Sequence, residues 1–579
     1  MNLAIRFGAI RLSGLAAALL LPALVLAAPG AAALADPASS LSVLLKPGRM
    51  DEAKGTGSLQ VELRFSELPV AAGAPLLGLP LVIANTATVA DSLTELRATD
   101  ADGEIPLTVQ DDPAKGLVWS RHWLAGRAVH GPVVVRYLAP VDNTPPKRGS
   151  GPPYALRTEG GGVSGVGNTF ILLPEDTKVR KISLRWDIAA LPKGSTATSS
   201  FGEGDVALPD GPADQLASTV FMAGPMEREP AAVSETGFSS AWMGAPPFDP
   251  RPLMAWTNDL HGWMSGFFQD KAVPPYRVFL RYNPINAGGG TALTRSFLTT
   301  YGADTQGESL KGTLAHEMTH TWTESDAGQW YGEGVAVHYQ GLLPFRAGLL
   351  SPEAFLEDLN DTARRYYANP LNGTPDQEIA PRFWEDTRIR VLPYDRGGLY
   401  FAVLDGRIRR ATAGRRSVDD LVLEMNRRRA AGQSNDDAAW VELVTQTLGE
   451  DGRKLHQAML AGALMLPEPD DFGPCFTRTT AKVRRFELGF EPKSLVGTTK
   501  VIRGLIPGSE AAKAGLKDGD VVTYAVALDG VQGDPNKTLT LKVTRDGKTF
   551  PLTYLPRGEQ VDIYQWMRKP GTESLNCVY

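Results

Sequence analysis

The sequence lacks an excess of positive charge. Its 59 Lys and Arg residues are outnumbered by 65 Asp and Glu residues, which gives a formal net charge of −6 at pH 7. Removing a leader that carries Arg6 and Arg11 takes the charge from −6 to −8. This balance excludes a general nucleic-acid-binding protein, which needs a basic surface. The expected partners are therefore proteins or peptides.

Long apolar runs are missing after the first 35 residues, so we predict no stable membrane anchor. At the N-terminus, Arg6 and Arg11 precede an apolar stretch at 15–28, and small residues follow as far as Ala35. This order is typical of a secretory signal peptide, 1–35, cleaved after Ala35. A transmembrane helix is the alternative, but the stretch is short for one. We expect export, to the bacterial periplasm.

Cysteine is almost absent, because the chain has only Cys475 and Cys577. In an oxidising compartment these two can form one disulfide. The closed loop of about 100 residues would contribute about 4 to 5 kcal/mol in the chain-entropy model. Two free thiols are the alternative, but export and the placement of the pair around the last hundred residues favour the bridge.

A G-x-S-x-G turn, which carries the nucleophile of many serine hydrolases, is also absent. The chain instead contains HEMTH, His316 to His320. In an α-helix, residues four apart lie on one face, so His316 and His320 can offer two imidazoles to one metal ion, with Glu317 beside them. The alternative interpretation is a helix with two surface histidines and a solvated glutamate.

A second motif, WYGEG at 330–334, supports the metal site. Its Glu333 begins another helical stretch after a polar break at 324–329. Two antiparallel helices joined there would bring Glu333 back opposite His320. Catalytic zinc commonly takes three protein ligands and keeps a fourth position for water, and His, His, Glu is one of the usual sets. The sequence therefore predicts one zinc ion per chain, bound by His316, His320 and Glu333, with Glu317 as the general base.

The spacing of apolar residues changes twice along the chain, from strand-like to helical and back to strand-like, which predicts a multidomain α+β protein. Short β-rich runs separated by Gly, Pro and Asp, among them 132–140 and 169–175, predict strands and indicate a β-sandwich-like N-terminal domain at 36–225. Helical periodicity follows at 226–465, the range that contains both motifs, and the apolar spacing at 252–269 predicts an amphipathic helix. The segment 466–474 is interpreted as a linker. Short strands return at 475–579.

The C-terminal range contains RRFELGF and VIRGLIPGSEAAKAGLKDGDVV, which resemble a bacterial PDZ domain of the type found in HtrA-like proteases. The resemblance implies that Leu488, Gly489 and Phe490 form the carboxylate-binding loop, where backbone amides receive the C-terminus of a protein or peptide. Many such domains act as lids or spacers instead.

The order of the domains, together with HEMTHTW, WYGEG, RAGLLSPEAFLEDL and PYDRGGLYFAVLD, resembles the glycyl aminopeptidase family of zinc metallopeptidases. The resemblance covers nearly the whole mature chain and implies a thermolysin-like catalytic domain. In that family the tyrosine of the last motif hydrogen-bonds the oxyanion of the tetrahedral intermediate. By this match the role falls to Tyr394.

Two departures from the family pattern concern the substrate. Arg396 stands where the family usually has lysine, which keeps the charge but changes the geometry. The strand motif that presents a glutamate to the substrate amine in related aminopeptidases reads GGGTALTRS here, at 288–296, with no acid. We therefore expect a weak preference for free N-termini.

The predicted function is zinc-dependent peptide hydrolysis in which Glu317 accepts a proton from the attacking water and Tyr394 stabilises the oxyanion. The alternative is an exported scaffold that binds peptides through its PDZ groove and keeps a structural or relic metal site. A complete His, His, Glu set beside Glu317 favours the enzyme.

Overall fold

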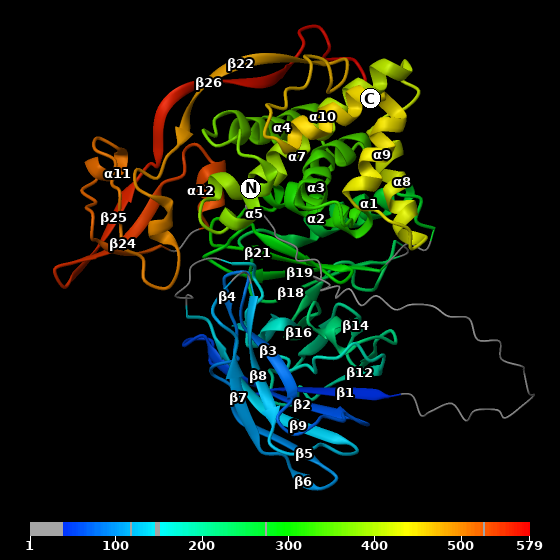
Figure 1. Cartoon of the computed structure of the whole chain (residues 1–579), viewed down its shortest axis with the longest axis vertical. Helices are drawn as coiled ribbons and strands as arrows, with labels where there is room; N and C mark the ends of the chain where they lie inside the picture. Colours follow the sequence, from blue (N-terminus) through cyan, green and yellow to red (C-terminus); the bar gives the residue numbers. More distant parts are fainter. Residues whose placement is uncertain are drawn as a thin grey trace, which may run out of the picture.

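The computed structural model describes residues 39–115, 118–144, 151–234, 236–271, 275–524 and 527–578. The predicted signal peptide, 1–35, lies outside the described residues. Figure 1 shows the sheets of the N-terminal part of the chain at the bottom, the helical region above them, and a small C-terminal lobe joined to the helices by a long two-stranded ribbon. This is the multidomain α+β architecture predicted from the hydrophobic period.

The N-terminal region is built of three sheets around one apolar core. Strands such as β1 and β2 alternate buried and open positions, as expected for a sheet with one face against a core. The largest sheet has the order β15-β12-β1-β2-β9-β5-β6, with β1 (Ser40–Pro47), β2 (Thr56–Phe65), β5 (Thr94–Asp100), β6 (Gly103–Glu104), β9 (Val133–Asp142), β12 (Lys181–Trp186) and β15 (Val206–Ala207).

The other two N-terminal sheets are smaller. One has the order β4-β3-β8-β7, with β3 (Pro75–Ile83), β4 (Thr86–Ala87), β7 (Leu107–Asp111) and β8 (Val118–Ala125). The other has the order β10-β11-β16-β13-β14, with β10 (Arg157–Glu159), β11 (Gly162–Val166), β13 (Thr196–Ser199), β14 (Gly202–Glu203) and β16 (Val220–Gly224). Two short 3-10 helices, η1 (Gly167–Thr169) and η2 (Ala213–Leu216), lie between strands.

A fourth sheet lies between these strands and the helices (Figure 1). Its order is β17-β18-β19-β21-β20, with β17 (Glu227–Arg228), β18 (Phe238–Trp242), β19 (Tyr276–Tyr282), β20 (Gly290–Leu293) and β21 (Ser296–Tyr301). Strands β18, β19 and β21 are parallel, and β20 is an antiparallel edge strand.

The helical region packs as one large core that includes the fourth sheet. Some of its helices begin at a side-chain cap; for example, the Ser351 side chain accepts a hydrogen bond from the Ala354 amide at the start of α4. The helices are α1 (Pro250–Phe267), α2 (Lys311–Thr323), α3 (Gln329–Arg346), α4 (Pro352–Tyr367), α5 (Ile379–Arg382), α6 (Thr387–Arg390), α7 (Leu392–Thr412), α8 (Val418–Ala430), α9 (Asp437–Leu448) and α10 (Glu450–Leu460), with 3-10 turns η3 (Gly307–Leu310) and η4 (Asp376–Glu378).

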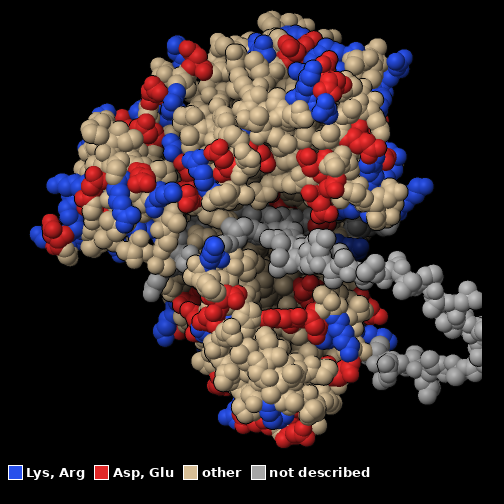
Figure 2. Space-filling model, viewed as in Figure 1, with Lys and Arg blue, Asp and Glu red and all other residues tan. Residues whose placement is uncertain are grey.

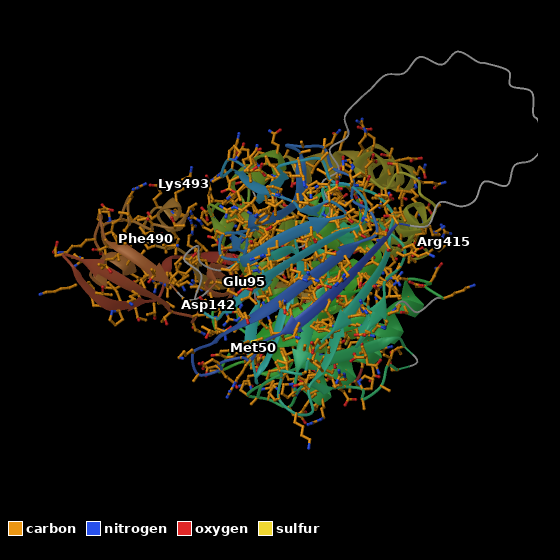
Figure 3. All side chains as sticks on the ribbon, turned by 90° about the horizontal axis from the view of Figure 1, so that it is seen from below. Met50, Glu95, Asp142, Arg415, Phe490 and Lys493 are labelled. Carbon is orange, nitrogen blue, oxygen red and sulfur yellow. A yellow bond between two sulfur atoms is a disulfide. The ribbon has the colours of Figure 1, made fainter. Side chains whose placement is uncertain are left out.

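The C-terminal lobe has a core of its own. It contains the sheet β23-β24-β25, and Figure 3 shows Phe490 and Lys493 in it, beside the larger body of the molecule. Strands β22 and β26 form the ribbon that leads to the lobe. The elements are β22 (Phe476–Phe486), η5 (Pro492–Leu495), α11 (Glu510–Lys513), β23 (Val521–Tyr524), α12 (Leu528–Gly533), β24 (Leu539–Arg545), β25 (Lys548–Tyr554) and β26 (Arg557–Arg568).

The far end of the ribbon is anchored in the helical core. Cys475 and Cys577 are joined by a disulfide there, and both are buried with Phe476 and Trp566 among the helical side chains. The segment 466–474, interpreted as a linker, also packs inward, because Phe472 belongs to the same core. The bridge therefore ties the ribbon to the helical region and lies outside the apolar core of the lobe.

Two further features are the distribution of charge on the surface and the apolar length of the helices. Lys and Arg side chains alternate with Asp and Glu over the face shown in Figure 2, without a large patch of positive charge. In the part of the chain that the structure describes, no helix is both long and apolar enough to span a bilayer.

Candidate metal centre

Three helices meet at the site, and two of them, α3 and α7, approach closely at a pair of glycines. A Cβ atom on Gly334 of α3 would lie 2.7 Å from the Cα of Gly397 in α7, so a larger residue at this crossing would force the helices apart. Glu333 precedes one of these glycines, and Tyr394 lies one helical turn before the other. The close crossing brings both side chains toward α2, which carries HEMTH.

The three predicted metal donors converge on one point. The Nε2 atoms of His316 and His320 lie 3.3 and 3.5 Å from the same oxygen, Glu333 Oε2. A tetrahedral zinc ion about 2.0 to 2.1 Å from each donor would hold the donors about 3.3 to 3.4 Å apart. All three residues are buried. The donor types and the two distances to Glu333 therefore fit a zinc ion.

Electrostatics also suit a cation. Burial alone would raise the pKa of Glu333, but hydrogen bonds from His316 and His320 hold it well below its usual value. Burial lowers the pKa of His316, whereas Glu333 and Glu317 raise it, and the net direction is upward. Two carboxylates thus place negative charge around the imidazoles, in a buried site where a cation is strongly favoured.

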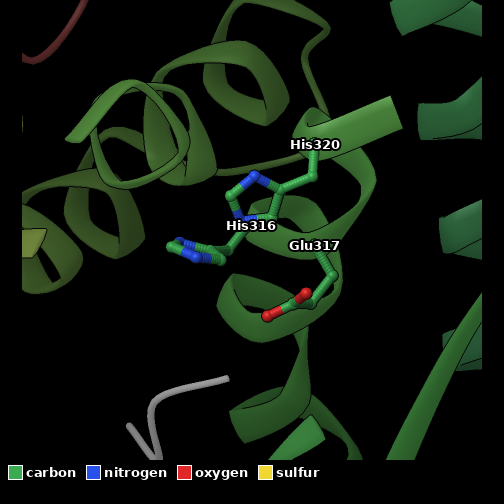
Figure 4. Close-up of side chains that lie close together, drawn as sticks. All are labelled: His316, Glu317 and His320. Carbon is green, nitrogen blue, oxygen red and sulfur yellow. The ribbon is translucent and has the colours of Figure 1, made fainter. Parts of the chain in front are cut away.

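Glu317 lies beside the donors. Ligand atoms of His316, Glu317 and His320 lie within 4.8 Å of one another, and Figure 4 shows the three side chains leaving α2 toward the same side. Glu317 is 2% exposed. A carboxylate at this distance can take a proton from a water molecule bound at the metal position.

The structure also assigns a partner to the outer nitrogen of His316. His316 Nδ1 lies 3.1 Å from Gln340 Oε1, and Gln340 Nε2 donates to Asp358 Oδ1 at 2.7 Å. Such partners fix the tautomer and the orientation of a metal-binding histidine. The sequence analysis missed Gln340, although it lies seven residues after Glu333 and therefore on the same face of α3.

Tyr394 lies against the donors. Its ring stacks on His316 with the centroids 5.9 Å apart. Burial, together with Glu333 and Glu317, raises the pKa of Tyr394 well above its ordinary value. The hydroxyl therefore keeps its proton at neutral pH and can serve as a hydrogen-bond donor.

A cleft opens beside the donors. The cavity has a volume of about 680 Å³, and Glu317 and His320 lie in its wall. Ala292 and Leu293 of the edge strand β20 line the same cavity, as does Arg295 in the turn that follows. An edge strand has backbone groups with which an extended peptide can pair.

The cleft contains carboxylates that the sequence analysis did not consider. Asp270 and Glu324 line it, although neither lies in the acid-free segment 288–296. Asp270 Oδ2 accepts a hydrogen bond from Trp322 Nε1 at 3.1 Å, and Glu324 pairs with Arg429 at 3.1 Å. An amine-binding carboxylate could thus come from other elements.

Arg396, the departure from the family lysine, serves a structural purpose. Its side chain is 1% exposed, donates to the Thr374 carbonyl and lies 3.5 Å from Asp376. It therefore holds the segment before α5 and does not enter the cleft lining. His261, which lacks a partner at metal spacing in the sequence, is buried and stacks on Tyr276.

The loop matched to the PDZ pattern lies in the C-terminal lobe, away from the metal donors. Gly489 has φ +81, and Leu488 and Phe490 are buried in the lobe core. The Leu488 carbonyl accepts from the Tyr554 hydroxyl at 2.8 Å, and the Gly489 carbonyl accepts from the Ile506 amide at 2.8 Å. These contacts fix the carbonyl side of the loop.

Comparisons with known proteins give the fold. No protein-family model matches the sequence, and no curated protein matches it. An aminopeptidase N family protein from Idiomarina loihiensis has a similar structure, with a TM-score of 0.63 and 14% identity over 90% of this chain and 97% of that one.

Two further solved structures are less similar. They are an M1 zinc metallopeptidase from Deinococcus radiodurans (TM-score 0.45, 13% identity, 75% of this chain and 96% of that one) and leukotriene A4 hydrolase from Saccharomyces cerevisiae (0.43, 14%, 75% and 69%). The likeness to the Idiomarina protein, at 14% identity, establishes the fold alone.

Proposed function

We propose that this protein is a zinc-dependent metallopeptidase with one zinc ion per chain. The observation that carries the proposal is the convergence of His316 and His320 on one oxygen of Glu333, at 3.3 and 3.5 Å. The shared fold with an aminopeptidase N family protein supports it. Zinc bound there would lower the pKa of a coordinated water toward 7 and polarise the carbonyl of a bound peptide.

The residues around the donors supply the proton transfers. Glu317, buried beside the histidines, accepts a proton as water attacks the scissile carbonyl, and then gives it to the leaving amine. Tyr394 donates its hydroxyl hydrogen to the carbonyl oxygen as negative charge develops there. Loss of one such donor costs about 3 to 4 kcal/mol, or roughly a hundredfold to a thousandfold in rate.

The substrate is a peptide that extends along the cleft. The edge strand β20 lines the cavity next to His320 and Glu317, and an extended chain paired with this strand would place a peptide bond near the donors. The finer family assignment, to glycyl aminopeptidases with a thermolysin-like catalytic domain, rests on the sequence motifs. We propose it together with export to the periplasm.

For the C-terminal lobe we propose a PDZ-like unit that can receive the C-terminus of a protein or peptide. The positive φ of Gly489 supports a tight carboxylate-binding loop, and the carbonyl oxygens of Leu488 and Gly489 are engaged elsewhere. In the described part of the chain, no hydrogen bond uses the three loop amides. Amides without internal acceptors suit a carboxylate ligand.

The proposal is tested by metal analysis together with digestion of a mixed peptide library. The purified protein should contain about one zinc per chain, and His320→Ala should lose it. Glu317→Gln should keep the metal and lose hydrolysis, because it removes the base and leaves the ligands. Full zinc content in His320→Ala would contradict the ligand set, and full turnover by Glu317→Gln would place the base elsewhere.

The second candidate function is an exported scaffold with a structural metal site. It predicts zinc content without hydrolysis of any peptide in the library. The buried position of Glu317 beside both histidines favours the enzyme, since a structural site needs no base there.

A further inference from the structure

A buried contact joins the C-terminal lobe to α6, the short helix that directly precedes the helix carrying Tyr394. Asp529 of α12 accepts hydrogen bonds from the Thr387 hydroxyl and from the Arg390 guanidinium, both on α6. Arg390 Nε lies 3.1 Å from each of the two carboxylate oxygens. Asp529 is 6% exposed and Thr387 is 3% exposed. Asp529, Arg390 and Thr387 thus form a buried, hydrogen-bonded ion pair between α12 and α6, which we call the Asp529 clamp.

The clamp leads directly to Tyr394. Helix α6 ends at Arg390, α7 begins at Leu392, and the Asp395 amide donates to the Val391 carbonyl at 2.9 Å, so the helical path continues almost unbroken. Residues 390 and 394 are four positions apart and therefore project from one face. Asp529 holds the guanidinium end of Arg390. Because the Arg390 backbone adjoins α7, this contact also restrains the first turn of α7, which carries Tyr394.

Trp384 connects the same two residues by packing. The Arg390 guanidinium lies over the Trp384 ring at 5.3 Å from its centroid. Trp384 in turn packs against the small apolar cluster that contains Tyr394, Leu392 and Ile389. The phenol is therefore supported from behind by residues that the Asp529 clamp holds in place.

Among the described residues, α12 has a further hydrogen bond to the helical region, from Arg364 of α4 to the Gly533 carbonyl at 3.0 Å, but it does not reach α6. A cavity of about 180 Å³ separates Trp384 and Arg390 from Leu495, Tyr524 and Leu528 of the lobe. The neighbouring ion pair between Lys493 and Glu385, at 3.2 Å, is largely exposed on the lysine side and is therefore weak. The buried clamp is the contact by which α12 can set the position of α6.

Arg390 remains charged in this setting. Burial lowers the pKa of its guanidinium, but Asp529 raises it and the net direction is upward. Removing one partner of a buried ion pair leaves the other charge without compensation. Loss of Asp529 would therefore push Arg390 toward solvent and release the start of α7.

We propose that Asp529 is a positioning residue for catalysis: through Arg390 and Thr387, the C-terminal lobe holds Tyr394 in the orientation that the developing oxyanion requires. The inference rests on the proposed peptidase function and on Tyr394 as the oxyanion donor. It gives the lobe a part in the chemical step that is separate from any peptide that the lobe binds.

The test is a double-mutant cycle on the full-length, zinc-loaded protein. Asp529→Ala should lower kcat by about tenfold to a hundredfold with little change in KM, because a small misplacement of a catalytic group has that effect. In the Tyr394→Phe background the same substitution should change kcat by less than about twofold, since there is no hydroxyl left to position. Asp529→Asn, which keeps an acceptor oxygen, should recover part of the loss.

A binding measurement accompanies the rates. A phosphinic peptide carries a tetrahedral anionic centre that mimics the oxyanion, so its affinity should fall in Asp529→Ala and in Tyr394→Phe, and should fall no further in the double variant. Zinc content should stay at one per chain in all of them. If Asp529→Ala does not fold, Arg390→Gln breaks the same contact from the catalytic side and takes its place in the cycle.

Asn360→Ala is the matched control. Asn360 exchanges two hydrogen bonds of 2.8 Å with the Trp566 backbone and so ties β26 to α4 at another point of the same junction. Its effect on kcat should be the same with and without the Tyr394 hydroxyl.

Two results separate the failure of this inference from that of the proposed function. If Asp529→Ala lowers kcat equally in the wild type and in Tyr394→Phe, and Tyr394→Phe alone is slower than the wild type, the positioning role is overturned and the proposed peptidase function stands. Absence of zinc-dependent hydrolysis in the wild type, with no affinity for the phosphinic peptide, would overturn the proposed function itself.

Discussion

The amide of Gln340 should control how tightly the protein holds zinc. For His316 to bind a metal through Nε2, its Nδ1 must carry the hydrogen, and Gln340 Oε1 is placed at 3.1 Å to accept it. The amide cannot rotate freely, because its Nε2 donates to Asp358 at 2.7 Å. Gln340 is completely buried, so water cannot easily replace it. Gln340→Met keeps the length of the side chain and removes the acceptor.

The expected loss is tenfold to a hundredfold in zinc affinity, the usual effect of removing the hydrogen-bond partner of a metal-binding histidine, or about 1.4 to 2.7 kcal/mol. Competition with a chelator of known affinity at pH 7 measures it directly, without any assay of hydrolysis. Thermal unfolding of the zinc-free proteins shows whether the substitution has also damaged the helices.

Asp358→Asn provides the matched control. Burial raises the pKa of Asp358 to about 6, against an opposing effect of Gln340, so the residue is mostly ionised at pH 7. The asparagine keeps an oxygen that accepts from the Gln340 amide, and the zinc affinity should change by about threefold or less. An unchanged affinity in Gln340→Met, with intact zinc-free stability, would refute the role given to Gln340.

Three further outcomes are expected. Non-reducing peptide mapping should recover Cys475 and Cys577 in one linked peptide pair, and reduction should lower the stability of the ribbon and the lobe by up to about 4 to 5 kcal/mol while zinc content stays constant; two free thiols in the purified protein would contradict this. When the pH falls from 7 to 5, the free energy of unfolding should drop by about 2 kcal/mol more in the wild type than in His261→Phe. Burial lowers the pKa of His261 to about 4, against weaker effects of the Thr236 backbone and Asp270, so below pH 6.5 the unfolded chain takes up a proton that the folded chain does not; equal urea-unfolding curves at the two pH values for both proteins would exclude it. Matched peptides with free and acetylated N-termini should be cleaved with kcat/KM values that differ by less than about a hundredfold, since 288–296 has no acid, and a larger preference for the free amine would direct attention to Asp270 of the cleft.

The sequence predicted elements well where one short segment decides its own structure. The strand expected at 132–140 is β9 (Val133–Asp142), and the helix expected at 252–269 is α1 (Pro250–Phe267). The strand expected at 169–175 is wrong. Phe170, Ile171 and Leu172 are each 0% exposed, but the segment leaves η1 without entering a ladder. A short apolar run reports burial, and it does not by itself distinguish a strand from a buried irregular segment.

Composition was a poorer guide to the joints between domains. The segment 466–474 has the Pro, Asp and Gly content of a linker, yet Phe472 lies in the helical core and Asp471 pairs with Arg410. Turn-forming residues indicate that a segment is irregular. They do not reveal whether the irregular segment is exposed, because that depends on what packs over it.

For the candidate site, the predictable part was the part with helical spacing. His316 and His320 are four apart, and Gln340 could have been found in the same way from its seven-residue distance to Glu333. The crossing of Gly334 with Gly397 could not, because nothing in either segment indicates that the other lies so close that a Cβ atom would not fit between them.

The contact between Asp529 and α6 could not be predicted from the sequence, because its partners lie far apart along the chain. Asp529 follows Arg390 by 139 positions, and other segments hold its helix beside α6: Arg557, at the start of β26, donates to the Val531 carbonyl of α12 at 2.7 Å, and Arg364 of α4 donates to the Gly533 carbonyl at 3.0 Å. At its other end the ribbon is fixed in the helical core by the disulfide. By our inference, the position of Tyr394, the proposed oxyanion donor, depends in part on a ribbon anchored at both ends. No motif encodes such a dependence, because each contact along it joins segments that only the folded chain brings together.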